Sequence, residues 1–270
     1  MPTVTSHAPG TFCWLDLGAH DLPAAREFYT RLFGWEAVNN HYGPDEGDVY
    51  VMFKLRGQNV AATYAMDPNQ AAMGIPSAWL CYVAVESADA SAARARELGA
   101  TIMADSFDIM DVGRMALVQD PGGALVALWQ PASHPGVGIR DEPGAAGWWE
   151  LATHDTARAG EFYGGLFGWK GRAMDGAPGL DYTVLSGPTG MVGGMYAITE
   201  KMEGMPPSWM PYFIVEDADA AAEQVTALGG TVLHGPLDVP MVGRVALIRD
   251  PQGAMFYIIT YTGAQASRER

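Results

Sequence analysis

The sequence predicts an α+β fold in which four βαβββ modules pair into two domains, each closing one cup-shaped sheet. The first observation is a repeat: EFYTRLFGW, which begins at Glu27, returns as EFYGGLFGW at Glu161 in a chain of 270 residues. The second is that a strand, an amphipathic helix and further strands follow one another twice in each half. The third is the late turn DPGG in the first half and DPQG in the second, a composition typical of hairpins.

The first module is built around the first copy of the repeat. Trp14–Leu17 alternates as a short strand, and Asp21 is placed to cap the helix that follows. Apolar residues recur at helical spacing on one face of this helix: Ala25, Phe28, Tyr29, Leu32 and Phe33. Gly34 stands where a helix often ends in left-handed backbone. Strands near 49–55 and 60–66 complete the module.

The same order restarts in the second module and again in the second half. We expect a strand at 80–85, a helix at 89–98 ended by Gly99, and strands near 101–104, 115–119 and 124–130. The stretch 14–35 matches 148–169 without a gap, and 79–90 matches 209–220. One module leaves a sheet face uncovered, so adjacent modules must pair to enclose a cavity.

These matches divide the chain into two homologous domains. We expect a first domain at 1–131, a linker at 132–147 that is rich in Gly and Pro, and a second domain at 148–270. The chain is long enough for each domain to bury a core of its own.

The amino-acid composition indicates which classes of binding partner are unfavourable. With 49% hydrophobic and 17% charged residues the chain is globular, and its net charge of −15 with 16 Lys and Arg disfavours nucleic acid and anionic lipid. The start, MPTVTSHAPG, lacks the features of a signal peptide, and no apolar run is long enough for a membrane helix. Cys13 and Cys81 are expected to be half-buried reduced thiols. We therefore expect a cytoplasmic monomer or homodimer.

The paired modules, the pattern D…A..FY..LFGW and the D-P-x-G hairpin resemble one known superfamily. It is the glyoxalase, bleomycin-resistance and extradiol-dioxygenase superfamily, also called vicinal oxygen chelate. The resemblance covers nearly the whole chain, and the two W-[LW]-[DE]-L openings are most similar to tandem-domain proteins labelled glyoxalase-like or hydroxylase. This fold hosts lyases, isomerases, dioxygenases and drug binders, so the resemblance leaves the activity open.

The resemblance also implies where a metal would be held. Metal-dependent members take one ligand seven residues before the Asp that opens a helix, and another seven residues after the Asp of the DP hairpin. Those positions here lack the usual ligand chemistry: they are Trp14, Tyr82, Ala127, Trp148, Tyr212 and Tyr257. We therefore expect no metal and no cofactor. Asp16 or Glu150 could still bind a metal, but neither has an obvious histidine partner.

Two acids are the candidate catalytic residues. Side chains alternate along a strand, so Asp16 faces the same cup as Trp14, and Glu150 the same cup as Trp148. On an apolar floor such a carboxylate has a raised pKa, and it can act as a general base or bind a ligand hydroxyl or amine. Equally, it can be held structurally by hydrogen bonds from backbone groups or tyrosine hydroxyls.

The residues around these acids, most of them aromatic, are the candidate ligand-binding set. They are Trp14, Tyr82, Ala127 and Trp129 in the first cup, and Trp148, Tyr212 and Tyr257 in the second. Because Ala127 stands where the second cup has the phenol ring of Tyr257, we expect the first cup to be the more open one. It would then be the better site for a planar aromatic ligand.

The remaining charged residues receive structural interpretations. His20 and His154 precede the capping aspartates and are expected at the rim, and His134 is assigned no role. Arg114 and Arg244 each follow an acidic residue, Asp108 and Asp238, by six positions. An ion pair across the loop is favoured over a clamp for an anionic ligand.

Two classes of function remain. The first is a protein that binds a small hydrophobic or aromatic metabolite or antibiotic, as bleomycin-resistance proteins do. The alternative is an enzyme of the same superfamily. It would be either a metal-independent acid–base catalyst that uses Asp16 or Glu150, or a lyase, dioxygenase or hydroxylase with displaced metal ligands.

Overall fold

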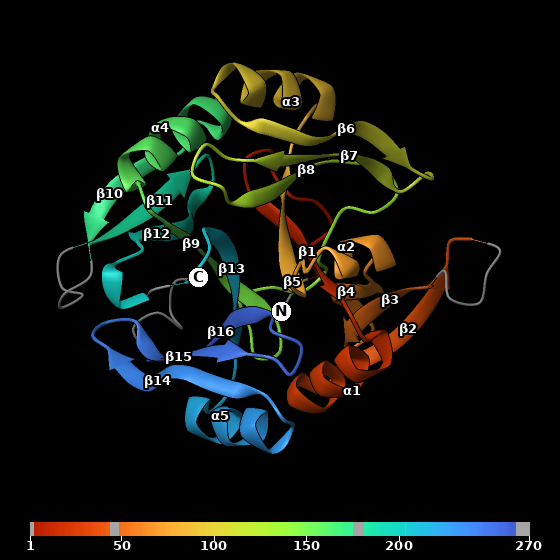
Figure 1. The fold of residues 1–270 in the computed structure, drawn as a ribbon, viewed down its shortest axis with the longest axis vertical. Helices are drawn as coiled ribbons and strands as arrows, with labels where there is room; N and C mark the ends of the chain where they lie inside the picture. Colours follow the sequence, from red (N-terminus) through yellow and green to blue (C-terminus); the bar gives the residue numbers. More distant parts are fainter. Residues whose placement is uncertain (1–2, 44–48, 175–180, 203, 263–270) are drawn as a thin grey trace.

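The computed structural model describes residues 3–43, 49–174, 181–202 and 204–262. The first half forms one eight-stranded sheet and the second half forms another (Figure 1). The elements of the first half are β1 (Phe12–Ala19), α1 (Leu22–Phe33), β2 (Glu36–His41), β3 (Val49–Leu55), β4 (Gln58–Ala65), α2 (Pro68–Ala72), β5 (Ala78–Ala84), α3 (Ala88–Glu97), β6 (Thr101–Ile109), β7 (Gly113–Gln119) and β8 (Leu125–Pro131).

The second half repeats this order. Its elements are β9 (Ala146–Thr153), α4 (Thr156–Phe167), β10 (Lys170–Met174), β11 (Tyr182–Gly187), β12 (Gly190–Ala197), the 3₁₀ helix η1 (Glu200–Met202), β13 (Ser208–Ile214), α5 (Ala218–Ala227), β14 (Thr231–Val239), β15 (Gly243–Arg249) and β16 (Met255–Tyr261). The four modules lie around the centre of the molecule with their main helices on the outside (Figure 1). None of the helices in the described ranges is long and apolar enough to cross a membrane.

Each sheet joins two modules at its centre. The strand order of the first sheet is β2-β3-β4-β1-β5-β8-β7-β6, and the second sheet has the same order in its own strands. The central pair, β1 with β5 or β9 with β13, is antiparallel and takes one strand from each module. The predicted α+β fold with two domains of paired βαβββ modules is therefore confirmed. Neither sheet closes into a barrel.

The helix ends follow local sequence chemistry. The Asp21 side chain accepts the N–H of Ala24 at 3.0 Å, and α1 ends at Gly34, whose φ is 68°. In α3 the cap is Ser87, which accepts from the N–H of Ala90 at 3.2 Å. Since α3 begins at Ala88, the expected helix start at position 89 is one residue late.

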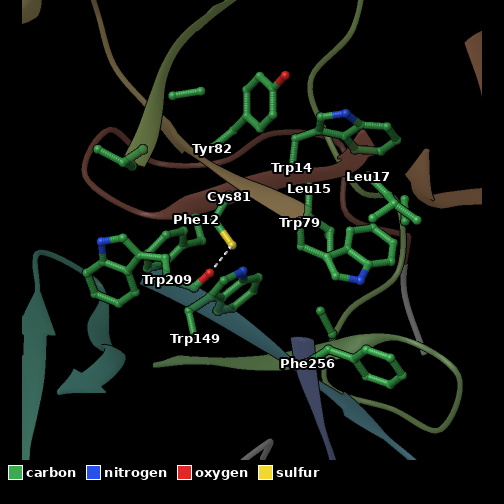
Figure 2. Close-up of a cluster of buried hydrophobic side chains, with 14 of the residues drawn as sticks. Phe12, Trp14, Leu15, Leu17, Trp79, Cys81, Tyr82, Trp149, Trp209 and Phe256 are labelled. Atoms are coloured by element: carbon green, nitrogen blue, oxygen red, sulfur yellow. Dashed lines mark hydrogen bonds between the residues drawn. The ribbon is translucent and has the colours of Figure 1, made fainter. Parts of the chain in front are cut away.

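The two domains share a core on the faces of the sheets that carry the helices. In Figure 2, Trp14 and Tyr82 lie on one side of β1 and β5, whereas Cys81 lies on the other side, toward the second domain. Here Phe12 stacks on Trp149 with ring centroids 4.9 Å apart. The other face of each sheet is left free, and this face forms the cup.

A reciprocal pair of hydrogen bonds joins the domains. The hydroxyl of Tyr29 in α1 donates to Asp250 in the second domain, and that of Tyr163 in α4 donates to Asp120 in the first, both at 2.9 Å. The two aspartates belong to the DP hairpin turns, and both are buried. Each turn is thus completed by a helix from the other half.

The predicted linker is hydrogen-bonded to strands of the first domain. The Val137 N–H donates to the carbonyl of Cys13 at 2.8 Å, and the Gly138 N–H donates to that of Asn59 at 2.8 Å. The second sheet starts at Ala146, two residues before the boundary expected from the repeat. The segment after β8 therefore runs along the edge of the first cup before the second domain begins.

Candidate functional site

A cavity of about 420 Å³ occupies the cup of the first sheet. Its floor is formed by β1, β3 and β5, and its lining includes Trp14, Asp16, Tyr50, Tyr82 and Trp129. Because paired strands present the same face, the register that places Trp14 opposite Tyr82 also brings their side chains into one cup. The sequence therefore identified most of the aromatic floor of this cavity.

Asp16 is the buried polar centre of the first cup. Its Oδ2 accepts the hydroxyl hydrogens of Tyr50 and Tyr82, both at 2.8 Å. Trp14 in turn donates its indole N–H to the hydroxyl oxygen of Tyr50 at 2.9 Å. Asp16 Oδ1 is buried and has no hydrogen-bond partner. The carboxylate is thus held on one oxygen and has the other unsatisfied.

Burial raises the pKa of Asp16 to about 6, although the hydrogen bonds from Tyr50 and Tyr82 oppose the rise. The same burial, together with the nearby Asp16 carboxylate, raises the pKa of both tyrosines well above their usual value. Both hydroxyls are therefore neutral at physiological pH and act as donors to Asp16. The hydrogen bonds from tyrosine hydroxyls that the structural interpretation expects are present at Oδ2. A role of Asp16 as a base or as a ligand anchor stays a prediction.

The second cup is built on the same plan, and it opens into a cavity of about 1390 Å³ whose lining extends to Thr11, Phe12 and residues 140–143. Glu150 Oε1 accepts the hydroxyl hydrogen of Tyr212 at 2.8 Å, and Trp148 donates its indole N–H to Tyr182 at 2.9 Å. Burial raises the pKa of Glu150 to about 7, although the hydroxyls of Tyr212, Tyr182 and Tyr257 oppose the rise. Both domains thus carry a buried acid in a cage of tyrosine hydroxyls.

The expected order of cavity sizes is wrong: the second cup is the larger one. Tyr257 does not fill it, because its ring lies flat on Tyr212 with centroids 4.2 Å apart. The linker contributes to both cavities, with Ser133 and His134 at the first and residues 140–143 at the second. Ala127 is fully buried and does not line the first cavity. Its small side chain therefore opens no space there.

Tyr50, Tyr182 and His134 lie in the cups but were missed from the sequence. The two tyrosines occupy corresponding strands, β3 and β11, in VYVMF and DYTVL, and this repetition could have revealed them. His134 has no counterpart in the other half and gave no such signal. Its ring packs edge-on against Trp14, with centroids 4.5 Å apart.

The positions where the resemblance places metal ligands lack the usual ligand chemistry in both cups. The positions expected to carry ligands do meet: Trp14 pairs with Tyr82 and Tyr82 with Ala127 in the first sheet, and Tyr212 pairs with Trp148 and Tyr257 in the second. Neutral tyrosines, indoles and a methyl group are poor ligands for such an ion. Across the described ranges, no group of three or more His, Cys, Asp or Glu side chains is placed to hold one.

The arginines pair with acids, as expected. Arg114 reaches Asp108 at 2.8 Å and also Asp89 of α3 at 3.0 Å. Arg244 makes the matching contacts with Asp238 and Asp219. Neither arginine lines a cavity described above. The preferred interpretation as an ion pair is confirmed, and each arginine in addition fastens a helix to its hairpin.

Comparison with known proteins places these features in a family. The family model described as Glyoxalase/Bleomycin resistance protein/Dioxygenase superfamily matches residues 11–128 and 136–258. The chain is 41% identical to "Putative glyoxylase CFP32" of Mycobacterium tuberculosis over 96% of its own length and 98% of that protein. It is 34% identical to "Anthracycline biosynthesis protein DnrV" of Streptomyces peucetius, with 95% of each chain covered.

Solved structures share the fold at low sequence identity. The Mn(II)-bound glyoxalase from Novosphingobium aromaticivorans superposes with a TM-score of 0.63 and 16% identity, covering 93% of this chain and 82% of that one. The 2,3-dioxygenase LapB from Pseudomonas sp. KL28 gives 0.62 and 16%, covering 96% and 93%. At these identities the likeness concerns the fold alone.

Proposed function

Because the chain belongs to the Glyoxalase/Bleomycin resistance protein/Dioxygenase superfamily, we propose that it binds aromatic small molecules in its two cups. A buried carboxylate is the polar anchor in each cup. The relative named for anthracycline biosynthesis supports an aromatic ligand class, because anthracyclines are fused-ring aromatic compounds. The ligand then lies against tryptophan and tyrosine rings and donates a hydrogen bond to Asp16 or Glu150.

The unpartnered Oδ1 of Asp16 is the observation that carries this proposal. A carboxylate oxygen that is buried without a hydrogen-bond donor destabilises the folded protein, because its desolvation is not compensated. A ligand hydroxyl or amine that donates to this oxygen removes the penalty. The surrounding rings offer flat apolar surface, and about 420 Å³ is within the range of small-molecule sites. Such a cavity selects a planar ring that carries a hydrogen-bond donor.

A matched pair of probes tests the anchor. We expect 2-naphthol, which has a hydroxyl donor, to bind about tenfold or more tighter than 2-methoxynaphthalene, which has none, since bonds to charged groups contribute about 1.5–3 kcal/mol. Asp16→Asn combined with Glu150→Gln should reduce this preference to about threefold or less. Calorimetry at pH 8, where both acids are ionised, measures the affinities. Glu161→Gln, a change of an exposed acid in α4, is the control. Equal affinity of the two probes for the wild type would contradict the proposal.

The chemistry of the cups also predicts metal content. We expect protein grown in metal-supplemented medium to carry far less than one transition-metal ion per domain, because the tyrosines and tryptophans that replace the ligands bind such ions poorly. Elemental analysis of the purified protein measures this. One tightly held Zn, Fe, Ni or Mn ion per domain would show that other residues form a metal site.

Acid–base catalysis without a metal is the second candidate. It is favoured by the raised pKa values of Asp16 and Glu150, about 6 and about 7, because a general acid or base works best when its pKa is near the working pH. Any such activity should depend on pH in this range and be lost in Asp16→Asn or Glu150→Gln. An activity that survives when Asp16→Asn and Glu150→Gln are combined would exclude this role.

A further inference from the structure

His134 contributes a second unsatisfied polar atom to the first cup. It follows β8 in the predicted linker, and its side chain lines the cavity. Its backbone is fixed: the His134 N–H donates to the carbonyl of Val112 at 3.0 Å, and the Trp129 indole donates to the carbonyl of His134 at 3.1 Å. The imidazole Nε2 is buried and has no hydrogen-bond partner. The ring is therefore held in place by its backbone and by Trp14, while Nε2 is left unpaired.

The imidazole is neutral at physiological pH. Burial lowers the pKa of His134 to about 4, and the nearby His7 lowers it further. A neutral imidazole nitrogen either donates or accepts one hydrogen bond, depending on the tautomer. His134 can therefore pair with a hydroxyl or a carbonyl group of a ligand.

Unpaired buried polar atoms are concentrated in the first cup. Among the described residues, three buried side-chain atoms lack a partner: Asp16 Oδ1, His134 Nε2 and Trp149 Nε1. The third belongs to the ring stacked on Phe12 in the interdomain core. The residues that carry the first two atoms, Asp16 on the floor and His134 in the linker, line one cavity. Buried polar groups in proteins are nearly always paired, so two in one cavity indicate a ligand with two polar groups.

The second cup offers a contrast. Glu150 Oε1 accepts the hydroxyl hydrogen of Tyr212 at 2.8 Å, and the hydroxyls of Tyr196 and Tyr257 hydrogen-bond to each other at 3.1 Å. Within the part of the chain that the structure describes, no buried polar atom of Glu150 or of these tyrosines lacks a partner. The buried polar atoms of these residues in the second cup therefore have hydrogen-bond partners within the protein. A ligand of the second cup does not need to supply the two polar groups that the first cup lacks.

From this we infer that the first cup selects an aromatic ligand with two polar substituents, such as a dihydroxy- or hydroxyketo-arene. One hydroxyl donates to Asp16 Oδ1, and the second substituent pairs with His134 Nε2. This inference rests on the proposed function and adds His134 as a residue that determines specificity in one cup.

A series of naphthols tests the inference in the Glu150→Gln variant. This variant keeps the carboxylate of Asp16 alone, so the part of the affinity that depends on a ligand hydroxyl is attributed to the first cup. We expect at least one dihydroxynaphthalene isomer to bind about tenfold tighter than 2-naphthol. His134→Phe should reduce this gain to about twofold and change the affinity for 2-naphthol by less than about threefold, since one hydrogen bond is lost. His154→Phe, a change of an exposed histidine that lines neither cavity, is the matched control.

Nitrogen-15 NMR of the histidine side chains gives a second readout that needs no variant. The Nε2 resonance of His134 should shift when the dihydroxynaphthalene binds and remain nearly unchanged with 2-naphthol. If 2-naphthol binds with the preference described above but no isomer gains affinity, or the gain survives His134→Phe, the inference is wrong and the proposed function stands. If 2-naphthol shows no dependence on Asp16, both are wrong.

Discussion

Replacing Phe213 by alanine should lower the free energy of unfolding by about 3–5 kcal/mol, the range for removing a fully buried phenylalanine. Phe213 of β13 is wholly buried between the domains. Its ring lies 4.8 Å from that of Phe33 and 5.3 Å from that of Trp79 between centroids, and both of these belong to the first domain. The space left by the ring is bounded by large side chains from two sheets, which cannot all move to fill it.

Urea unfolding followed by fluorescence and by circular dichroism measures the loss. Because Phe213 packs on α1 of the other half, both domains should lose stability together and unfold in one transition. Phe107→Ala removes a ring that is 45% exposed in β6 and should cost far less. A loss below about 1 kcal/mol, or a shift in only part of the transition, would mean that the shared core does not couple the domains.

Changing Glu150 to glutamine should remove about 3 kcal/mol of pH-dependent stability. The pKa of Glu150 in the folded protein is about 7, against an ordinary value of 4.5. Between these values the folded state keeps a proton that the unfolded chain has lost, so the stability of the wild type falls as pH rises. Below about pH 4.5 both states are protonated and the acid contributes no difference. Above about pH 7 the full cost of the buried charge is present.

The measurement is the free energy of unfolding at a series of pH values from about 4 to 8.5. The wild type should lose stability across this range, and the Glu150→Gln variant should lose about 3 kcal/mol less, with Asp16 responsible for a similar slope that remains. Glu161→Gln, a change of an exposed acid, should leave the curve unaltered. Parallel curves for the wild type and Glu150→Gln would show that Glu150 has an ordinary pKa in the folded protein.

The sequence predicted those features that depend on repeats and on neighbours along one strand. Asp16 and Trp14 share a face because strand alternation is local, and Tyr82 was located by counting from the next helix. Tyr50 was missed because its approach to Asp16 depends on the order β3-β4-β1, in which β4 runs parallel to β1. That order is set by packing across the whole sheet. The repeated tyrosine in β3 and β11 could therefore have marked Tyr50 as a candidate, but not its approach to Asp16.

The relative sizes of the two cavities could not be predicted from the sequence, for a related reason. Comparing Ala127 with Tyr257 assumed that side-chain volume at one position decides the space, but the ring of Tyr257 turns onto Tyr212. His134 enters the first cup from a segment that composition identified only as a linker. Both effects depend on tertiary contacts, so they become visible only when the chain is folded.

The reciprocal bonds from Tyr29 to Asp250 and from Tyr163 to Asp120 have an evolutionary consequence. They are the pair that a two-fold axis would generate in a homodimer of one half, where the same contact occurs twice. Once two such halves are joined in one gene, a substitution no longer has to suit both sites at once. The first cup can acquire the imidazole of His134 from the connecting segment. The second cup can keep a wider cavity in which the buried polar groups hydrogen-bond to one another. Fusion thus preserves the symmetry of the scaffold and releases the two binding sites to diverge.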